Sequence, residues 1–121
     1  MAAHSPMEVR LRLMCGDEIA LGPGKIKLLR LIDETGSISA AARAAGMSYR
    51  RAWLLVETMN ACFTQPLVAT ETGGAKGGGA KVTDLGREVA TLYAALDLKA
   101  AAAIADDVGQ LHRHLRRRDQ L

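Results

Sequence analysis

Residues 36–51 read Gly-Ser-Ile-Ser-Ala-Ala-Ala-Arg-Ala-Ala-Gly-Met-Ser-Tyr-Arg-Arg, and this stretch decides the fold. Ser37 or Ser39 can cap a helix whose alanines are strong helix formers, and Gly46 can end it. One residue separates that glycine from Ser48, which can cap a second, longer helix. A short helix, a tight turn and a longer helix predict a helix-turn-helix.

The elements on either side of this motif follow from hydrophobic periodicity and from turn residues. The expected elements, in chain order, are a strand over 9–13, a short return strand at 19–21, a helix over 25–35, the two helices of the motif over 37–45 and 48–63, a hairpin of strands at 67–72 and 81–83, and a long helix from 84 to at least 104. This order predicts a mainly α protein with a small β part: a winged helix-turn-helix followed by a long C-terminal dimerisation helix.

Composition narrows the class of protein. The 121 residues are 49% hydrophobic and only 3% aromatic, which favours a helical core over a β-sandwich. No apolar run approaches the about 18 residues that a membrane span needs, and the first residues do not resemble a secretory signal. Cys15 and Cys62 stand too far apart for a metal-binding pair and form no disulfide framework. We therefore expect one cytoplasmic domain without a membrane partner.

Charge is divided between two parts of the chain. Residues 43–81 carry five basic and two acidic side chains, whereas residues 84–107 carry five acidic and two basic ones. A basic region beside an acidic one is typical of a protein that meets a polyanion with one face. This division supports double-stranded DNA as the partner.

The helix that begins after Ser48 is expected to enter the major groove, because the first residues of a recognition helix meet base edges. Arginine can bind guanine through two hydrogen bonds, and hydroxyl groups can reach bases or phosphates. The glycine-rich residues 73–80 are expected to form the tip of a wing that lies on the DNA backbone. Trp53 is expected to pack in or beside the core. The DNA-binding candidates are Ser37, Ser39, Ser48, Tyr49, Arg50, Arg51, Lys76 and Lys81.

The long helix carries an apolar stripe that one small chain cannot fully cover, so we expect a homodimer. The dimerisation candidates recur at three- and four-residue steps and are Leu85, Val89, Leu92 and Leu96. The expected organisation is a flexible N-terminus (1–8), a winged helix-turn-helix domain (9–83), a dimerisation helix (84–108) and a basic tail (109–121).

Other functions find little support in the sequence. The glycine-rich stretch lacks a Gly-Lys-Ser/Thr at the offset that a nucleotide-binding loop requires. His112 and His114 lie two residues apart, with no further ligand at metal-binding spacing. No catalytic arrangement is present, so we expect no enzyme, no cofactor and no metal. The alternative left open is a winged-helix module that binds another protein, against which the basic charge of residues 43–81 argues.

Several motifs resemble the N-terminal domain of ModE-type molybdate-responsive transcription regulators, and the helix-turn-helix is also similar to that of the wider LysR-type group. The matching stretches are GSIS at 36–39, AGMSYR at 45–50, AW at 52–53, MN at 59–60, TGG at 72–74, KGGGA at 76–80 and VT at 82–83. The resemblance covers roughly residues 9–105. It implies that the recognition helix and wing bind operator DNA and that the long helix pairs two chains.

The resemblance also bears on molybdate. Full-length members of that family continue into small β-rich domains that bind molybdate, and their molybdate-contacting residues have no counterparts in this sequence. The resemblance thus implies a part in molybdenum-related regulation, and we expect a regulator that does not itself bind molybdate.

Overall fold

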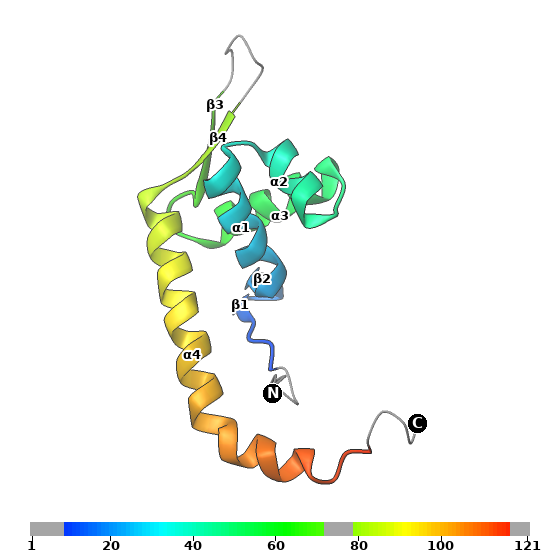
Figure 1. Cartoon of the computed structure of the whole chain (residues 1–121). Helices are drawn as coiled ribbons and strands as arrows, with labels where there is room; N and C mark the ends of the chain where they lie inside the picture. Colours follow the sequence, from blue (N-terminus) through cyan, green and yellow to red (C-terminus); the bar gives the residue numbers. More distant parts are fainter. Residues whose placement is uncertain (1–8, 72–78, 117–121) are drawn as a thin grey trace.

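The structure, a computed structural model, describes residues 9–71 and 79–116. Its elements in chain order are β1 (Leu13–Cys15), β2 (Glu18–Leu21), α1 (Pro23–Thr35), α2 (Ile38–Ala45), α3 (Tyr49–Cys62), β3 (Val68–Glu71), β4 (Gly79–Val82) and α4 (Asp84–His112). The helices α1, α2 and α3 pack together, the β3–β4 hairpin projects from them, and α4 runs past α1 and away from the body (Figure 1). The chain is a winged helix-turn-helix, as the sequence predicts.

Local signals set the helix boundaries. The hydroxyl groups of Ser37 and Ser48 each accept a backbone N–H from the first turn of the helix that follows, α2 and α3 respectively. Gly36 and Gly46 end α1 and α2 in the left-handed conformation, with φ of 72° and 74°. Because each of these signals acts within a few residues, the sequence places α2 and α3 to within a residue or two.

Aliphatic side chains from every helix fill a single core. Apolar residues at helical spacing on α1 and α3 are buried, and Phe63, just past the end of α3, is half-buried beside the core. The core residues from the helices are Ile26, Leu28, Leu29, Ile32, Ile38, Ala41, Ala42, Ala52, Val56, Met59, Val89 and Tyr93. The close-packed alanines of α2 let it cross α1 and α3 at short range.

The first strand begins later than the alternating pattern predicts. Residues 9–12 are not a strand, and β1 starts at Leu13, which pairs with Leu21 of β2 in an antiparallel hairpin. The expectation of a strand over 9–13 was wrong, because an alternating pattern does not specify the hydrogen-bond partners of the backbone. Here the carbonyl oxygen of Leu11 accepts the hydroxyl hydrogen of Tyr93 at 2.8 Å, so this segment is tied to α4 instead.

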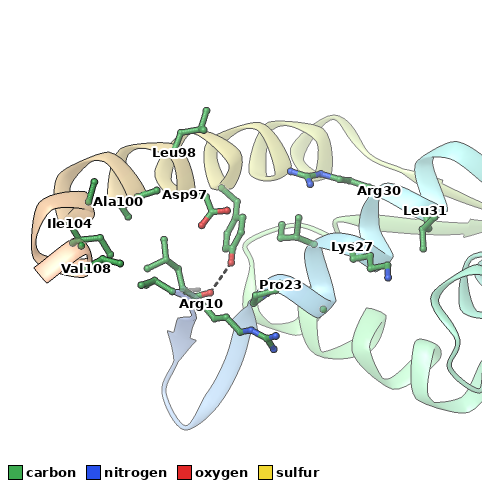
Figure 2. A pocket seen from close by; sticks show the side chains of 18 of the residues that line it. Arg10, Pro23, Lys27, Arg30, Leu31, Asp97, Leu98, Ala100, Ile104 and Val108 are labelled. Atoms are coloured by element: carbon green, nitrogen blue, oxygen red, sulfur yellow. Dashed lines mark hydrogen bonds between the residues drawn. The ribbon is translucent and has the colours of Figure 1, made fainter. Parts of the chain in front are cut away.

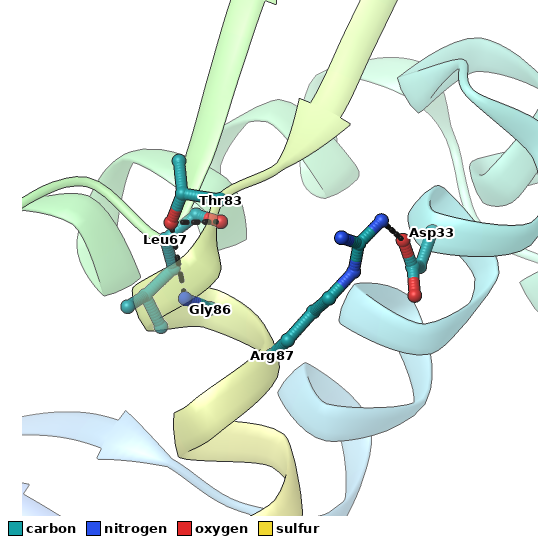
Figure 3. Close-up of polar contacts among 5 residues, drawn as sticks. All are labelled: Asp33, Leu67, Thr83, Gly86 and Arg87. Carbon is teal, nitrogen blue, oxygen red and sulfur yellow. Dashed lines mark hydrogen bonds and ion pairs between the residues drawn. The ribbon is translucent and has the colours of Figure 1, made fainter.

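The start of α4 is locked onto the body at several points (Figure 3). The Thr83 hydroxyl accepts the Gly86 N–H at 3.0 Å and lies 3.2 Å from the Leu67 carbonyl oxygen. A Cβ at position 86 would overlap that same carbonyl oxygen, so only glycine fits there. The next residue, Arg87, pairs with Asp33 of α1 at 3.0 Å. The helix therefore leaves the wing in a fixed direction.

The far end of α4 extends past the expected boundary at residue 108 and ends at His112. The expected flexible N-terminus (1–8) and the last residues of the expected basic tail (117–121) lie outside the described residues. Within the described part of the chain, no helix is both long enough and apolar enough to cross a membrane.

Candidate nucleic-acid interface

The first turn of α3 presents three consecutive predicted site residues to solvent. Tyr49, Arg50 and Arg51 are all exposed, because the opposite side of α3, which begins with Ala52, packs against the core. At 100° per residue, Arg50 lies near the middle of the exposed surface, with Tyr49 on one side of it and Arg51 on the other. The turn thus offers an aromatic hydroxyl and two guanidinium groups side by side.

The three predicted serines differ in what their hydroxyl groups can do. Ser37 is half-buried and accepts the Ala40 N–H at 3.0 Å, while Ser48 is exposed and accepts the Arg51 N–H at 3.1 Å. Both hydroxyls therefore already serve as helix caps. Ser39, in the first turn of α2, is exposed, which leaves its side chain open to a partner at the surface.

A notch of about 230 Å³ joins α2, α3 and the base of the wing. It brings predicted residues from separate segments together: Ser37 and Ser39 from the start of α2, and Tyr49 from α3. Trp53 also lines it and is 36% exposed, so the expectation that this side chain packs in or beside the core holds only for part of the ring. The remaining lining residues are Ile38, Thr70, Glu71, Gly79 and Ala80.

The wing is anchored to the helices by backbone and amide hydrogen bonds. The Ala80 N–H donates to the Gly36 carbonyl at 3.0 Å. The Asn60 amide on α3 donates to the Val68 carbonyl and accepts the N–H groups of Leu67 and Val68, at 2.8–3.1 Å. Sequence reasoning gave this asparagine no role, although it stands among the motif residues.

The basic residues predicted for the wing are only partly described. Lys81 lies on β4, exposed and opposite Ala69 of β3. Lys76 and the glycine-rich tip fall outside the described residues. The structure thus places one of the two predicted wing lysines at the surface next to the notch-lining strand residues.

A second basic group, which sequence reasoning missed, lies beside α3. Partial burial lowers the pKa of Lys25, at the start of α1, and the nearby positive charges of Arg51 and Arg12 add to this, against the opposing effects of Cys62 and Glu18. Three cations, from the segment before β1, from α1 and from α3, thus share one neighbourhood with Glu18. No spacing pattern could reveal it, because the residues are far apart in the chain.

The predicted dimerisation stripe is divided in the structure. Val89 is 7% exposed and belongs to the chain's own core, and Leu85 is half-buried against that core. Leu92 and Leu96 are 61% and 53% exposed. The chain thus covers its own stripe at Val89 and partly at Leu85 but leaves Leu92 and Leu96 exposed, and the dimerisation role of all four residues stays a prediction.

A groove of about 1090 Å³ lies between α1, the segment before β1 and the far half of α4 (Figure 2). Its walls are mostly apolar and include Ala100, Ile104 and Val108 from α4 and Pro23 and Leu31 from α1. Lys27 and Arg30 of α1 and Asp97 of α4 add charge at its walls. Among the described residues, no three His, Cys, Asp or Glu side chains come together as a metal site would require.

Comparison with known proteins gives a consistent result. The chain is 38% identical over 103 residues to the DNA-binding transcriptional dual regulator ModE of Escherichia coli (strain K12) and 39% identical over 103 residues to the transcriptional regulator ModE of Yersinia pestis, each covering 83% of this chain and 39% of the relative. It is 40% identical over 85 residues to the molybdenum-pterin-binding protein MopB of Rhodobacter capsulatus, covering 70% of this chain and 32% of the relative. No family model matches the chain.

The chain spans between about a third and two fifths of the length of these relatives. Within that span it is homologous to the N-terminal region of ModE. The resemblance inferred from the motifs at 36–39 and 45–50 is thereby confirmed.

Proposed function

We propose that this homologue of the ModE N-terminal region is a transcriptional regulator that binds double-stranded DNA in a sequence-specific manner as a homodimer. The observation that carries the proposal is the first turn of α3. There, Tyr49, Arg50 and Arg51 stand exposed at the start of the second helix of a helix-turn-helix, next to the base of a wing. A recognition helix meets base edges with these same first residues.

The two arginines are assigned different contacts. Arg50 lies near the middle of the exposed surface of α3 and would pair with a base, whereas Arg51 shares its neighbourhood with Lys25 and Arg12. Clustered cations of this kind suit phosphates, which position a protein on the duplex without reading sequence. Lys81 on the wing would contact the backbone on the other side of α3.

The test is binding to a duplex selected by the full chain from a random library. Arg50→Ala should weaken binding by about 1–3 kcal/mol and relax the preference at one base pair. Arg51→Ala should weaken binding to all duplexes alike and make the affinity less dependent on salt. Lys99→Ala, which removes an exposed cation from α4, is the matched control and should change neither property. Unchanged affinity in both arginine variants would contradict the assignment of α3.

Salt dependence separates DNA binding from the alternative of a protein-binding winged helix. Neutralising several phosphates releases counterions, so the affinity for DNA should fall steeply as salt rises. Weak binding to all duplexes, with no preferred sequence and little response to salt, would favour the protein-binding alternative.

The dimer is proposed to form through the exposed part of α4 and not through the whole predicted stripe. Leu92 and Leu96 are exposed, and the groove between α1 and α4 is apolar and large enough for a helix face of a second copy. The groove carries both signs of charge, and its cations Lys27 and Arg30 would pair with Asp106 and Asp107, which lie exposed near the end of α4. Two-fold pairing would present two recognition helices to two half-sites.

We also propose that residues 9–116 bind DNA without binding molybdate. A tetrahedral dianion needs several convergent N–H or hydroxyl donors, and the hydroxyls of Ser37 and Ser48 already cap helices. Calorimetric titration of the purified dimer with molybdate should give no saturable heat at micromolar concentration. Saturable micromolar binding would contradict the proposal.

A further inference from the structure

The notch between α3 and the wing base places two aromatic rings where a recognition helix would approach DNA. Tyr49 is 56% exposed and Trp53, one helical turn later, is 36% exposed. Both line the notch, and both lie on the side of α3 that faces the start of α2 and the strands β3 and β4. Two large rings of α3 thus border a notch whose other walls come from the start of α2 and from the strands of the wing.

The chemistry of the walls decides what can occupy the notch. Among the nine described residues that line it, only Glu71 is charged, and that charge is negative. A phosphate group would be repelled there, and the cations that suit phosphate, Arg51 and Lys25, do not line the notch. The walls are otherwise aromatic rings, hydroxyl groups and small apolar side chains, so the fitting occupant is uncharged and at least partly apolar.

In the major groove of duplex DNA, one base-specific group is uncharged and apolar: the C5-methyl group of thymine. We propose that the notch receives a thymine methyl group, contacted by Trp53 and Tyr49, and that Trp53 is therefore a specificity-determining residue. This inference rests on the proposed DNA binding and adds to it an apolar contact, distinct from the hydrogen bonds assigned to Arg50.

Deoxyuridine tests the contact directly, because it differs from thymidine only by that methyl group. The probe is the duplex selected by the full chain, with each thymine replaced in turn by uracil. One thymine position in each half-site should be sensitive, and uracil there should weaken binding by about fourfold, which corresponds to the free energy gained by burying one methyl group. Substitutions at the other thymines should have little effect.

Variants then assign the contact to the notch. Trp53→Ala should weaken binding to the thymine duplex and abolish the difference between thymine and uracil at the sensitive position. Leu54→Ala is the matched control, because Leu54 is the neighbouring exposed apolar residue of α3 and does not line the notch. It should preserve the difference. Circular dichroism of both variants checks that the helices remain folded.

The outcomes separate this inference from the proposed function. Specific, salt-sensitive binding that no uracil substitution weakens would overturn the methyl contact and leave the DNA-binding proposal intact. A methyl effect that persists in Trp53→Ala, or that Leu54→Ala also abolishes, would overturn the assignment to the notch. Failure to select any duplex would overturn the proposed function, and this inference with it.

Discussion

The two halves of α4 are built from similar residues but have different surroundings. Residues 84–93 are fixed to the body by the Thr83 cap, the close approach at Gly86, the Arg87–Asp33 pair and the Tyr93 hydroxyl. Residues 94–112 include no residue classed as buried. In Figure 1 this second half continues away from the packed helices. One continuous helix therefore has a near half that is packed into its own chain and a far half that contains no buried residue and is proposed to take part in dimerisation.

This difference shows how a single amphipathic pattern can serve two purposes. The near half stabilises the fold, so substitutions there should change the free energy of unfolding. Substitutions in the far half, which includes Leu96, and at Leu92 should change the dissociation constant of the proposed dimer. Substitutions in each half therefore test the division.

The largest effect is expected from Leu92→Glu combined with Leu96→Glu. Each substitution occurs twice in a two-fold dimer, so the dissociation constant should rise by at least about a thousandfold. The free energy of unfolding of the monomer should change little, because both leucines are exposed. Light scattering measures the first quantity and urea denaturation the second.

Val89→Ala is the control for that prediction. This side chain is buried in the chain's own core, so its truncation should lower the free energy of unfolding by about 1–3 kcal/mol and leave the monomer's tendency to associate unchanged. Wild-type protein that is monomeric at micromolar concentration would contradict the proposed dimer.

The next effect compares two glycines of the same helix. Gly86→Ala should lower the free energy of unfolding by about 3 kcal/mol, because the new Cβ overlaps the Leu67 carbonyl and the Val82 side chain. Gly109→Ala meets nothing within 4 Å and should stabilise the helix by about 0.5–1 kcal/mol. Equal effects from the two substitutions, measured by urea denaturation, would contradict the division of α4.

A smaller effect is expected from Tyr93→Phe. The variant keeps the ring but loses the hydrogen bond to the Leu11 carbonyl, which should lower the free energy of unfolding by about 1 kcal/mol. An unchanged free energy of unfolding would show that the N-terminal segment is held by packing alone.

The same side chain predicts a dependence on pH. Burial raises the pKa of Tyr93 above its ordinary value of 10, and the negative charge of Asp97 adds to the shift. The folded protein therefore keeps the phenolic proton at pH values where the unfolded chain loses it. The stability from this group should be fully present below about pH 10 and lost as the pH rises through the folded-state pKa. The stability difference between wild type and Tyr93→Phe should accordingly shrink above about pH 10, and a constant difference would contradict the assignment.

The smallest effect is expected from Asp33→Asn, which breaks the pair with Arg87. Both side chains are well exposed, so the loss of stability should be smaller than in Tyr93→Phe and should vanish at about 1 M salt. A large, salt-independent loss would show that this pair fixes the direction of α4 more strongly than its exposure indicates.

The sequence predicts the parts of this fold that depend on neighbouring residues. Helix caps and helix-ending glycines act over three or four positions, so they can be recognised from the sequence. The examples here are Ser37, Ser48, Thr83, Gly36 and Gly46. These same signals locate the first turn of α3, which is why the sequence could place the candidate residues there at the start of a helix.

What the sequence could not predict depends on contacts between distant segments. The periodicity of α4 places Val89 beside Leu92 but does not say that Val89 faces the chain's own core. The alternation before β1 does not reveal that the Leu11 carbonyl bonds to a tyrosine 82 positions later. The notch and the cluster around Lys25 likewise come from three elements each, and only their packing brings them together.

Asn60 has a consequence for how the protein would be aligned with a duplex. Through its three hydrogen bonds to Leu67 and Val68, α3 and the first wing strand, β3, form one rigid piece. If α3 contacts bases while the wing contacts phosphates, the protein's own structure fixes the distance along the DNA axis between these two contacts. The operator sequence does not set that distance. Transferring α3 into another winged-helix protein to change that protein's target sequence therefore requires transferring Asn60 and its strand partners as well. Without them, the wing would contact phosphates at the wrong distance from the bases that α3 contacts.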